Sequence, residues 1–588
     1  GANVPAGSVV VGVSGTAPGY SVTINNSIGT TITAATALTF GANASFTGAL
    51  TIGGGTFQVK PAAATGTGAN LFATTNNLVF DRDSITGASG TAQSAGGTFR
   101  LMANGSLTYT ADVIQTMGTL TPTLGQGNIV VDAGNGAFSN IVRFNTFGTR
   151  AAGATLGFAP AASLAGIQFV TPPTPLNGQV GGFAYLTNAG TGAIDFIATP
   201  TANTNVTALN AATALPTLTG SATTNYVNTA NLTTTGAVAA STLRVVGGGQ
   251  TITLGGALTL TNTSATAIGG LLFDNSAGGA TITGSNIAGS VAANELIFIA
   301  GGATPANALT INSTIGAAAA SQFTKAGTGA IVLGGANAFT GNVYINEGTV
   351  RMASGSTSAA IGSPAAGTTF NLMQGATFDV NGAGGSAAPY TGATNLNTLS
   401  IGALSGSGTI TSGNAAASAL QIGVAATTAS GVFAGVIQNG SSSGLTVIRA
   451  ATSGTVALTG LNTYTGATVL TSGILQANVL ANGGVASSIG ASTNAAANLV
   501  FNGGTLLYQG SNATVYQTAQ TPSVTIDRLF TLAGNGTIDS SGTYGNNVVA
   551  APSANNAALV FGNTGALALA GFSFGAFVTS QALAALAP

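Results

Sequence analysis

Two aspartates, Asp81 and Asp83, are the closest pair of carboxylates in the sequence, and Arg82 lies between them. At positions i and i+2 of a strand, both carboxylates would lie on one face. Clustered acids with a nearby Arg or Lys are what a glycosidase or a polysaccharide lyase requires. The same residues also fit a solvated turn after a strand at 78–80, and we favour the turn. The 11 carboxylates of the whole chain are too dispersed to predict an oxygen cage for calcium.

Two other groups of charged residues are predicted to be structural. Asp527 and Arg528 are adjacent, and Glu347 lies four positions before Arg351. We expect a local ion pair at the end of a strand in each case. Neither group has the composition of a catalytic centre.

The absence of two residue types excludes much enzyme chemistry. The chain of 588 residues contains no Cys and no His. Disulfides, thiolate nucleophiles, Cys or His metal sites and Ser-His nucleophiles are therefore all excluded. We predict that the protein is not an enzyme, has no catalytic, cofactor-binding or metal-binding residues, and takes no small-molecule substrate.

Positive charge is sparse as well. The chain has 10 Lys+Arg, scattered from Lys60 to Arg528, which cannot form a basic patch of useful size. Lysine occurs only at positions 60 and 325, and neither is preceded by Gly, so there is no phosphate-binding P-loop. Nucleic acid is not an expected partner.

The elements that must position these residues are predicted to be short β-strands. Charged residues make up only 4% of the chain, against about 25% in ordinary globular proteins, and Gly contributes 89 residues. Gly or a β-branched residue interrupts almost every candidate helix. Runs rich in Val, Ile, Leu, Thr and Phe are bounded by Gly, Asn and Ser at intervals of roughly 8–12 residues, as in an all-β sandwich, barrel or solenoid. Predicted strands include 8–13, 78–80, 128–131, 251–254, 296–299, 331–333 and 499–501.

An internal repeat separates these alternatives. Phe339-Thr340-Gly341 recurs as Tyr464-Thr465-Gly466, 125 residues later (464 − 339), and a third copy is Phe46-Thr47-Gly48. After each copy come two positions of an inward face with period 2, then a Gly that predicts a sharp turn, then another apolar residue. These positions are Val343, Ile345, Gly348 and Val350; Thr468, Leu470, Gly473 and Leu475; and Leu50, Ile52, Gly55 and Phe57. One such unit cannot cover its own apolar face, so stacked coils of roughly 20–25 residues are expected.

Residues 325–341 and 458–466 resemble the passenger-associated transport repeat, which occurs in autotransporter passengers and in very large surface proteins of Gram-negative-type bacteria. Residues 243–315 also resemble the segment that precedes such repeats. The resemblance implies a right-handed parallel β-helix, export and no catalytic signature. An autotransporter should end in a translocator barrel, whereas this chain ends in Ala584-Ala585-Leu586-Ala587-Pro588. Either a barrel has been cleaved away or export follows another route.

Five segments are predicted along the chain. Residues 1–60 are an N-terminal β segment with the first repeat copy, and 61–240 are a less regular β region, a β-sandwich or an insertion. Residues 241–380 and 381–520 are β-helix with one repeat copy each. Residues 521–588 are a C-terminal β segment or an assembly contact, in which alternation of Phe572, Phe574 and Val578 favours a strand over a membrane helix.

Composition and resemblance together predict an extracellular or cell-surface protein. A chain that begins at Gly1 without Met is expected to have lost a signal peptide. A surface with so little charge has little protection against its own copies. The leading expectation is therefore a homopolymer, the subunit of a self-assembling fibre, sheath or surface layer.

The alternative is a monomeric β-helical adhesin or passenger that binds a surface glycan or another cell-envelope component. Residues 100–240 would then be its ligand-binding part. There, Gly181-Gly182-Phe183-Ala184-Tyr185 and Asp195-Phe196 form either an aromatic patch or, as we favour, buried strands. A polysaccharide-active enzyme is a distant third.

Overall fold

The structure is a computed structural model, and its regular elements are almost entirely β-strands, as predicted. Within the described residues there is no α-helix, and the two helical segments are single 3-10 turns, η3 (Asn275–Ala277) and η4 (Ala496–Asn498). The described residues are 8–14, 21–26, 49–52, 56–59, 72–81, 97–103, 109–261, 268–289, 295–302, 304, 306–316, 322–337, 339–354, 356, 361, 368–388, 394–424, 428, 430–509, 524–540, 559–565 and 568–569.

Two parallel sheets form a first stack of coils. The five-stranded sheet contains, in spatial order, β3 (Leu50–Ile52), β5 (Leu78–Asp81), β7 (Val113–Leu124), β9 (Asn140–Phe147) and β11 (Ala165–Phe169). The six-stranded sheet contains β4 (Thr56–Val59), β6 (Thr98–Leu101), β8 (Gln126–Val131), β10 (Thr155–Pro160), β12 (Ala184–Thr187) and the antiparallel β13 (Ile194–Phe196). The chain alternates between the two sheets, so that each pair of strands makes one coil. Part of the region for which a sandwich was considered is therefore a stack of parallel coils.

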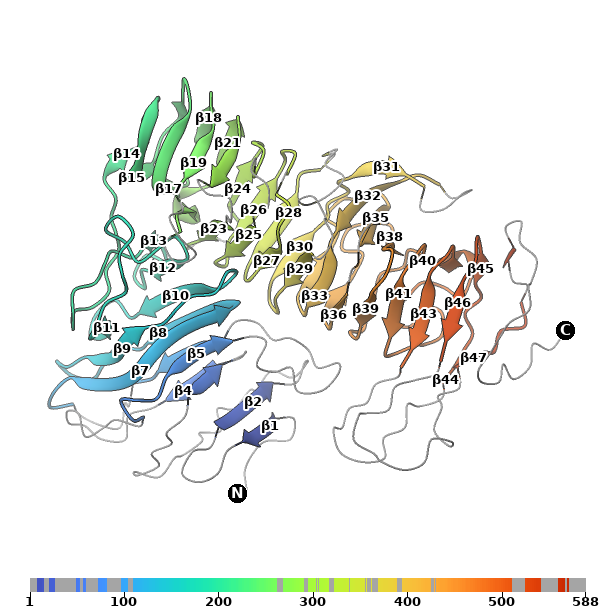
Figure 1. Ribbon diagram of the computed structural model, residues 1–588, viewed down its shortest axis with the longest axis horizontal. Helices are drawn as coiled ribbons and strands as arrows, with labels where there is room; N and C mark the ends of the chain where they lie inside the picture. The colour runs from blue at the N-terminus through green and yellow to red at the C-terminus, as the bar shows by residue number, and fades with distance from the viewer. Residues whose placement is uncertain are drawn as a thin grey trace.

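Three long sheets form a second, longer stack (Figure 1). The 16-stranded sheet contains β14 (Thr213–Ala214), β15 (Thr219–Asn228), β17 (Val238–Val246), β20 (Gly270–Asp274), β23 (Glu295–Gly301), β25 (Gln322–Ala326), β27 (Val343–Ile345), β29 (Thr369–Leu372), β33 (Ala403–Gly406), β36 (Gly431–Phe433), β39 (Thr455–Leu458), β41 (Ile474–Ala477), β43 (Thr505–Tyr508) and β46 (Thr537–Asp539), with β19 (Leu258–Leu260) and β22 (Ile287–Gly289) off this path. The nine-stranded sheet contains β16 (Leu232–Thr233), β18 (Thr251–Leu254), β21 (Ala280–Gly284), β24 (Ala308–Ile311), β26 (Ala330–Leu333), β28 (Thr349–Met352), β30 (Thr377–Asp379), β34 (Thr409–Thr411) and β37 (Val436–Ile437). The eight-stranded sheet contains β31 (Gly385–Ala387), β32 (Leu396–Ile401), β35 (Ser418–Ile422), β38 (Leu445–Arg449), β40 (Thr468–Leu470), β42 (Leu499–Phe501), β45 (Thr531–Leu532) and β48 (Ala568–Leu569).

Two small sheets complete the fold. They pair β1 (Ser8–Ser14) with β2 (Ser21–Asn26) antiparallel, and β44 (Val524–Ile526) with β47 (Leu559–Phe561) in parallel. The long stacks of parallel strands confirm the predicted parallel β-helix. The five predicted segment boundaries stay predictions.

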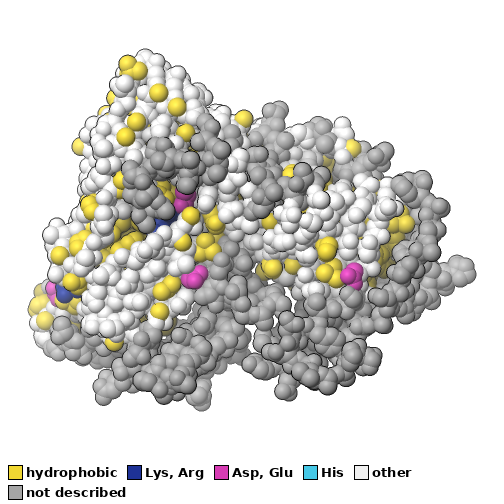
Figure 2. All heavy atoms as spheres, in the orientation of Figure 1, with side chains coloured by type: hydrophobic (Ala, Val, Ile, Leu, Met, Phe, Trp, Pro, Cys, Tyr) yellow, Lys and Arg dark blue, Asp and Glu magenta, His cyan; other side chains and the backbone are white. Residues whose placement is uncertain are grey.

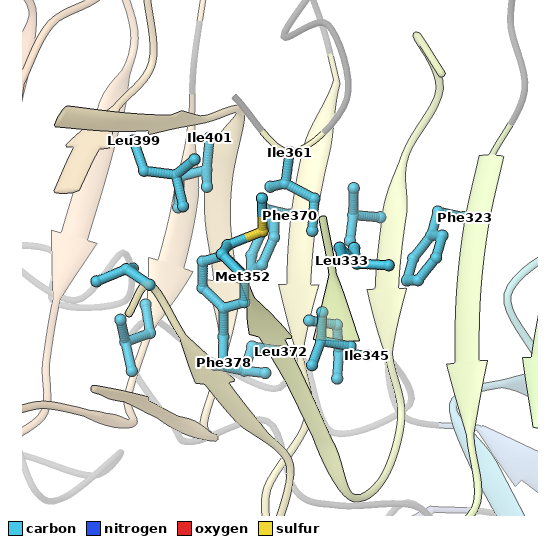
Figure 3. Close-up of a cluster of buried hydrophobic side chains, with 14 of the residues drawn as sticks. Phe323, Leu333, Ile345, Met352, Ile361, Phe370, Leu372, Phe378, Leu399 and Ile401 are labelled. Atoms are coloured by element: carbon cyan, nitrogen blue, oxygen red, sulfur yellow. The ribbon is translucent and has the colours of Figure 1, made fainter. Parts of the chain in front are cut away.

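Alternating apolar residues build the interior of the second stack. In β26, Ile331 and Leu333 are buried while their neighbours are half-exposed, and the same alternation recurs coil after coil. Figure 3 shows buried side chains from Phe323 of β25 to Ile401 of β32, which meet between the sheets. Phe323 stacks on the rings of Phe298 and Phe339, each with a centroid separation of 5.3 Å. Such ring pairs add about 0.5–1.5 kcal/mol each beyond their apolar burial.

The repeat corresponds to the joint between neighbouring coils. In one copy β26 pairs with β28, with Ile331 opposite Val350, and in the other β39 pairs with β41, with Val456 opposite Leu475. The turn glycines Gly348 and Gly473 have φ of 68° and 70°, which an L side chain rarely adopts. The predicted order of strand, glycine turn and strand is therefore confirmed in both copies.

In the N-terminal copy, β3 and β4 occupy the predicted positions. Its Phe46-Thr47-Gly48 and Gly55 lie outside the described residues.

The first edge of the long stack is partly closed. β15 pairs along its length with β17, but only Tyr226 and Val227 pair with β14 on the other side. A register shift interrupts β15 after Ser221, and the Tyr226 hydroxyl accepts a hydrogen bond from the Ser221 backbone N–H. Bulged and locally satisfied edges resist pairing with another chain. This edge is a poor site for end-to-end polymerisation.

The first stack lies against the side of the second (Figure 1). β20 and β23 are buried at every residue, so both of their faces are covered. On the outer face, Leu272, Ile297 and Ile299 belong to the same apolar cluster as Phe183 and Phe196 of the first stack. The two stacks therefore share a continuous apolar contact.

Candidate functional site

The sequence-predicted acid pair is only partly described. Asp81 is the last residue of β5, and Arg82 and Asp83 lie outside the described residues. Among the residues that are described, no three His, Cys, Asp or Glu side chains are placed together to hold a metal ion. The two-carboxylate arrangement considered for Asp81 and Asp83 therefore stays a prediction.

The predicted Glu347–Arg351 ion pair is wrong. Asp527 and Arg528 do interact through their charges: burial lowers the pKa of Arg528, and Asp527 is one of the groups that oppose this fall. Arg351 donates to Asp379 at 2.7 Å, not to Glu347, because Asp379 lies directly opposite Arg351 on the next coil. The buried Arg528 donates to backbone carbonyls and to Ser492 instead of its neighbour Asp527. In a stack of parallel strands, the residue one coil away is a closer neighbour than the residue four positions along the chain.

The proposed aromatic patch is buried. Phe183, Tyr185 and Phe196 all belong to the apolar cluster that joins the two stacks. The favoured interpretation of these residues as buried strand positions is therefore confirmed.

Charged residues gather instead in a seam between the stacks. In the space-filling view charged side chains are few, and a group of both signs lies in the recess between the two stacks (Figure 2). Hydrogen bonds and ion pairs place seven charged residues at this contact, most of them buried, and we call them the ionic seam: Arg150, Asp195, Arg244, Asp274, Glu295, Lys325 and Glu347. Sequence reasoning missed it because its members are far apart along the chain.

Arg150 and Glu295 form the central contact of the ionic seam. The Arg150 guanidinium donates to both carboxylate oxygens of Glu295 at 2.7 and 2.8 Å, and both side chains are almost fully buried. Glu295 also accepts from the backbone N–H of Gly153 at 2.9 Å and from the Thr324 hydroxyl at 2.6 Å. The guanidinium lies 4.9 Å from the ring centroid of Phe183. Both bonds to Glu295 come from one guanidinium nitrogen, Nη2, while Nε donates to the Ala154 carbonyl at 2.7 Å, so the buried guanidinium is held at two of its nitrogens.

Amide side chains extend the contact beside this pair. The Asn346 amide donates to the Gly153 carbonyl at 2.8 Å and to the Thr155 hydroxyl at 2.9 Å. Thr155 in turn donates to Gln126 at 2.6 Å. These bonds join the turn after β27 to two strands of the first stack.

Tyr185, Glu347 and Lys325 form the next part of the ionic seam. The Tyr185 hydroxyl donates to Glu347 at 3.4 Å, and the Lys325 ammonium donates to the backbone carbonyls of Gly327 and Glu347. Burial lowers the pKa of Lys325 and raises the pKa of Glu347. Burial, reinforced by Glu347, raises the pKa of Tyr185 well above its usual value.

Arg244 holds the far end of the ionic seam. Its guanidinium bridges Asp274, at 2.8 Å, and Asp195, at 3.3 Å. It also donates to the Ile194 carbonyl at 3.1 Å. Burial raises the pKa of Asp195, and the nearby Arg244 opposes that rise.

This arrangement holds two bodies together and does not present reacting groups to a substrate. Arg150, Glu295 and Lys325 are buried and hydrogen-bonded within the protein. A catalytic acid or base has to reach a substrate proton directly or through one water. The ionic seam therefore fits a structural role.

A buried cation also recurs at matching places in the two complete repeats. Lys325 lies near the end of β25, and Arg449 ends β38. Arg449 donates to the backbone carbonyls of Ile422, Gly454 and Ile474. In the same way, Lys325 donates to the backbone carbonyl of Gly327. Burial lowers the pKa of Arg449 to about 10. The cation thus satisfies carbonyls at the turn between coils.

No helix among the described residues is long and apolar enough to cross a membrane. Residues 570–588, where a strand was favoured over a membrane helix, lie outside the described residues.

Comparison with known proteins agrees with the architecture of the coils. The passenger-associated transport repeat family matches residues 35–59, 323–352 and 453–477. The chain is 34% identical over 224 residues to a protein named "Adhesin BmaC autotransporter" from Brucella suis biovar 1 (strain 1330). That match covers 37% of this chain but only 6% of the relative's length. No solved structure matches the chain. The chain therefore carries three copies of the passenger-associated transport repeat, as its sequence resemblance predicts.

Proposed function

We propose that this chain is part of a non-enzymatic, surface-exposed adhesin, a β-helical passenger that holds binding surfaces away from the cell. The observation that carries this proposal is the placement of repeats of the autotransporter passenger type at the coil joints of the parallel β-helix. The adhesin name of the similar Brucella protein supports the same class. Such a passenger is exported to the cell surface.

The distribution of charge supports a binding role over an enzymatic one. Most members of the ionic seam are buried between the stacks, where they fix the shape of the molecule. The face shown in Figure 2 carries few charged side chains, in keeping with the 4% of charged residues in the chain. A ligand would therefore be held by neutral hydrogen bonds and apolar contact, as suits a surface glycan or another envelope component, and not by charge.

The adhesin proposal is better supported than the fibre, sheath or surface-layer subunit. The bulged edge at β15 disfavours end-to-end strand pairing, and the similar protein is named an adhesin. A surface with little charge allows copies of the chain to associate, but it does not by itself indicate that they form a polymer.

Surface display tests the proposal. Residues 1–588 would be fused to a translocator barrel in a non-adherent bacterium, with a β-helical passenger of similar size as the control. We expect adherence to cultured epithelial cells or to immobilised cell-surface glycans to exceed the control by about tenfold. Display confirmed by antibody labelling, with adherence equal to the control on every surface, would contradict the proposal. Asp81→Asn is expected to leave adherence unchanged.

A further inference from the structure

Asn482 and Gly483 lie in the loop at residues 478–494, which leaves the long stack between β41 and β42. Leu480 and Ile489 of this loop are buried in the main apolar core, so the loop is anchored at two points. Asn482 itself is exposed, and its side-chain amide is within reach of water. In an Asn–Gly pair the glycine nitrogen can attack the preceding side-chain amide, because glycine has no side chain to obstruct the approach.

Asp527 contacts both groups that would take part in this attack. Its carboxylate Oδ1 accepts from the Gly483 backbone N–H at 2.7 Å, and its own backbone N–H donates to the Asn482 side-chain Oδ1 at 3.0 Å. The first contact is to the proton that the attacking nitrogen must lose. The second is to the oxygen that becomes negatively charged when the amide carbon is attacked. A base and an oxyanion donor therefore lie at the reacting atoms.

Neighbouring residues fix the position of Asp527. Its Oδ2 accepts from the Asn494 side-chain amide at 3.3 Å, and its backbone carbonyl accepts from the Asn563 side-chain amide at 2.7 Å. The adjacent Arg528 is buried and donates to the Ala481 carbonyl at 2.8 Å, directly before Asn482. The base and the reacting pair are thus held in place before any reaction, which lowers the entropic cost of bringing them together.

We propose that Asn482–Gly483 is a self-modification site, at which Asn482 is converted to aspartate or isoaspartate with Asp527 as the base. The Gly483 nitrogen bonds to the Asn482 Cγ while its proton passes to the Asp527 carboxylate. The Cγ–Nδ2 bond then breaks, and the proton passes from Asp527 to Nδ2, which leaves as ammonia. Water opens the resulting succinimide at either of its carbonyls, so no oxidant, reductant or cofactor is required.

The reaction takes place once in each molecule and changes the loop permanently. Residue 482 becomes an acid beside Asp527, and the two like charges repel each other. In the isoaspartate product, the backbone also runs through the former side chain and is lengthened by a methylene group. The loop of an aged molecule therefore differs in charge and in shape from that of a new one.

Peptide mass spectrometry of the purified 588-residue chain, incubated at neutral pH, measures the loss of ammonia at Asn482. Asn439–Gly440 is the matched control within the same chain. The Asn439 Oδ1 accepts from the backbone N–H groups of Leu445 and Thr465, both at 3.0 Å, and its Nδ2 donates to the Thr465 hydroxyl at 2.7 Å. This amide is held at both ends. We expect Asn482 to react at least about tenfold faster than Asn439 in the folded chain, and at a similar rate in guanidinium chloride.

Asp527→Asn removes the base but keeps the backbone N–H that contacts Asn482. In the folded chain it should slow the reaction at Asn482 by about tenfold or more and leave Asn439 unaffected, whereas in guanidinium chloride it should change neither rate. Circular dichroism verifies that the variant retains the β-helix.

Equal rates at Asn482 in the folded unchanged chain and the folded Asp527→Asn variant would overturn the inference. So would a folded, unchanged chain in which Asn482 reacts no faster than in guanidinium chloride, and this comparison needs no variant to fold. Because neither measurement uses a cell surface, the outcome is independent of whether the chain mediates adherence.

Discussion

Lys325 and Arg449 show how individual residues of this chain use charge. Each is a buried cation that donates hydrogen bonds to backbone carbonyls at a turn between coils. The predicted Glu347–Arg351 pair was wrong because the effective neighbour of Arg351 is one coil away. The Arg351–Asp379 pair could be found only after the strand register was known. A single sequence does not contain that register.

The stability of the chain should increase from pH 7 to pH 9 through Lys325. Burial lowers the pKa of Lys325 from 10.5 to about 7, so between these values the folded chain binds fewer protons than the unfolded chain. Stability then rises as pH increases through this window. Lys325→Met should flatten the dependence, as measured by urea unfolding at pH 7, 8 and 9. Glu347 lies beside the ammonium and Tyr185 beside Glu347, and burial raises the pKa of both groups. An unchanged slope in Lys325→Met would rule out this role.

At the scale of elements, alternating apolar residues and turn glycines were sufficient to predict the strands and the repeat. Val343, Ile345 and Val350 face the core as their spacing predicts. The first stack was harder to predict because its strands vary from the 12 residues of β7 to the 3 residues of β3, and only β3 and β4 belong to a copy of the repeat. The number of residues per coil can vary wherever a loop leaves the stack. The spacing of apolar residues along the sequence therefore does not by itself reveal which strands lie side by side.

The repeat glycine Gly348 should tolerate a methyl group much less well than Gly375. Both have positive φ, 68° and 79°, so Ala at either position pays a similar backbone strain of about 1–2 kcal/mol. A Cβ at Gly348 would collide with the Gly329 carbonyl and the Lys325 ammonium, whereas a Cβ at Gly375 meets no atom within 4 Å. We expect Gly348→Ala to lower the free energy of unfolding by at least about 1 kcal/mol more than Gly375→Ala. Equal losses in urea denaturation would show that the turn at Gly348 relaxes freely.

At the scale of the whole molecule, the docking of the two stacks is what sequence reasoning did not anticipate. A signal was present: 271–273 and 296–299 are uninterrupted apolar runs, as expected for strands that are covered on both faces. What covers them, and at what angle, depends on groups such as Arg150 and Glu295, which are 145 residues apart in sequence. No local pattern encodes that pairing.

The Arg150–Glu295 pair should contribute more to the specificity of docking than to its strength. Removing one partner of a buried pair leaves an uncompensated charge, so Glu295→Met or Arg150→Met alone should cost about 3–5 kcal/mol. The double variant, Met at both positions, should cost much less than the sum of the two single changes, because the apolar contact through Leu272 and Ile297 remains. Urea denaturation measures the three free energies, and small-angle X-ray scattering shows whether the stacks stay docked.

The half-exposed pair Arg100–Asp132, with an N–O distance of 3.0 Å, is the control for this cycle. Because water screens it, its removal should cost no more than about 1 kcal/mol. If the Arg150 and Glu295 single variants were additive in the double variant, the two charges would act independently, and the angle between the stacks would have to be set by the apolar contact alone. The double variant could instead keep its free energy of unfolding while small-angle X-ray scattering shows a wider range of arrangements of the two stacks. In that case the apolar contact would hold the stacks together, and the ion pair would set the angle between them. We expect the second result, because dispersion and apolar burial are non-directional, whereas the Arg150 guanidinium is oriented by its Nη2 bonds to Glu295 and its Nε bond to the Ala154 carbonyl.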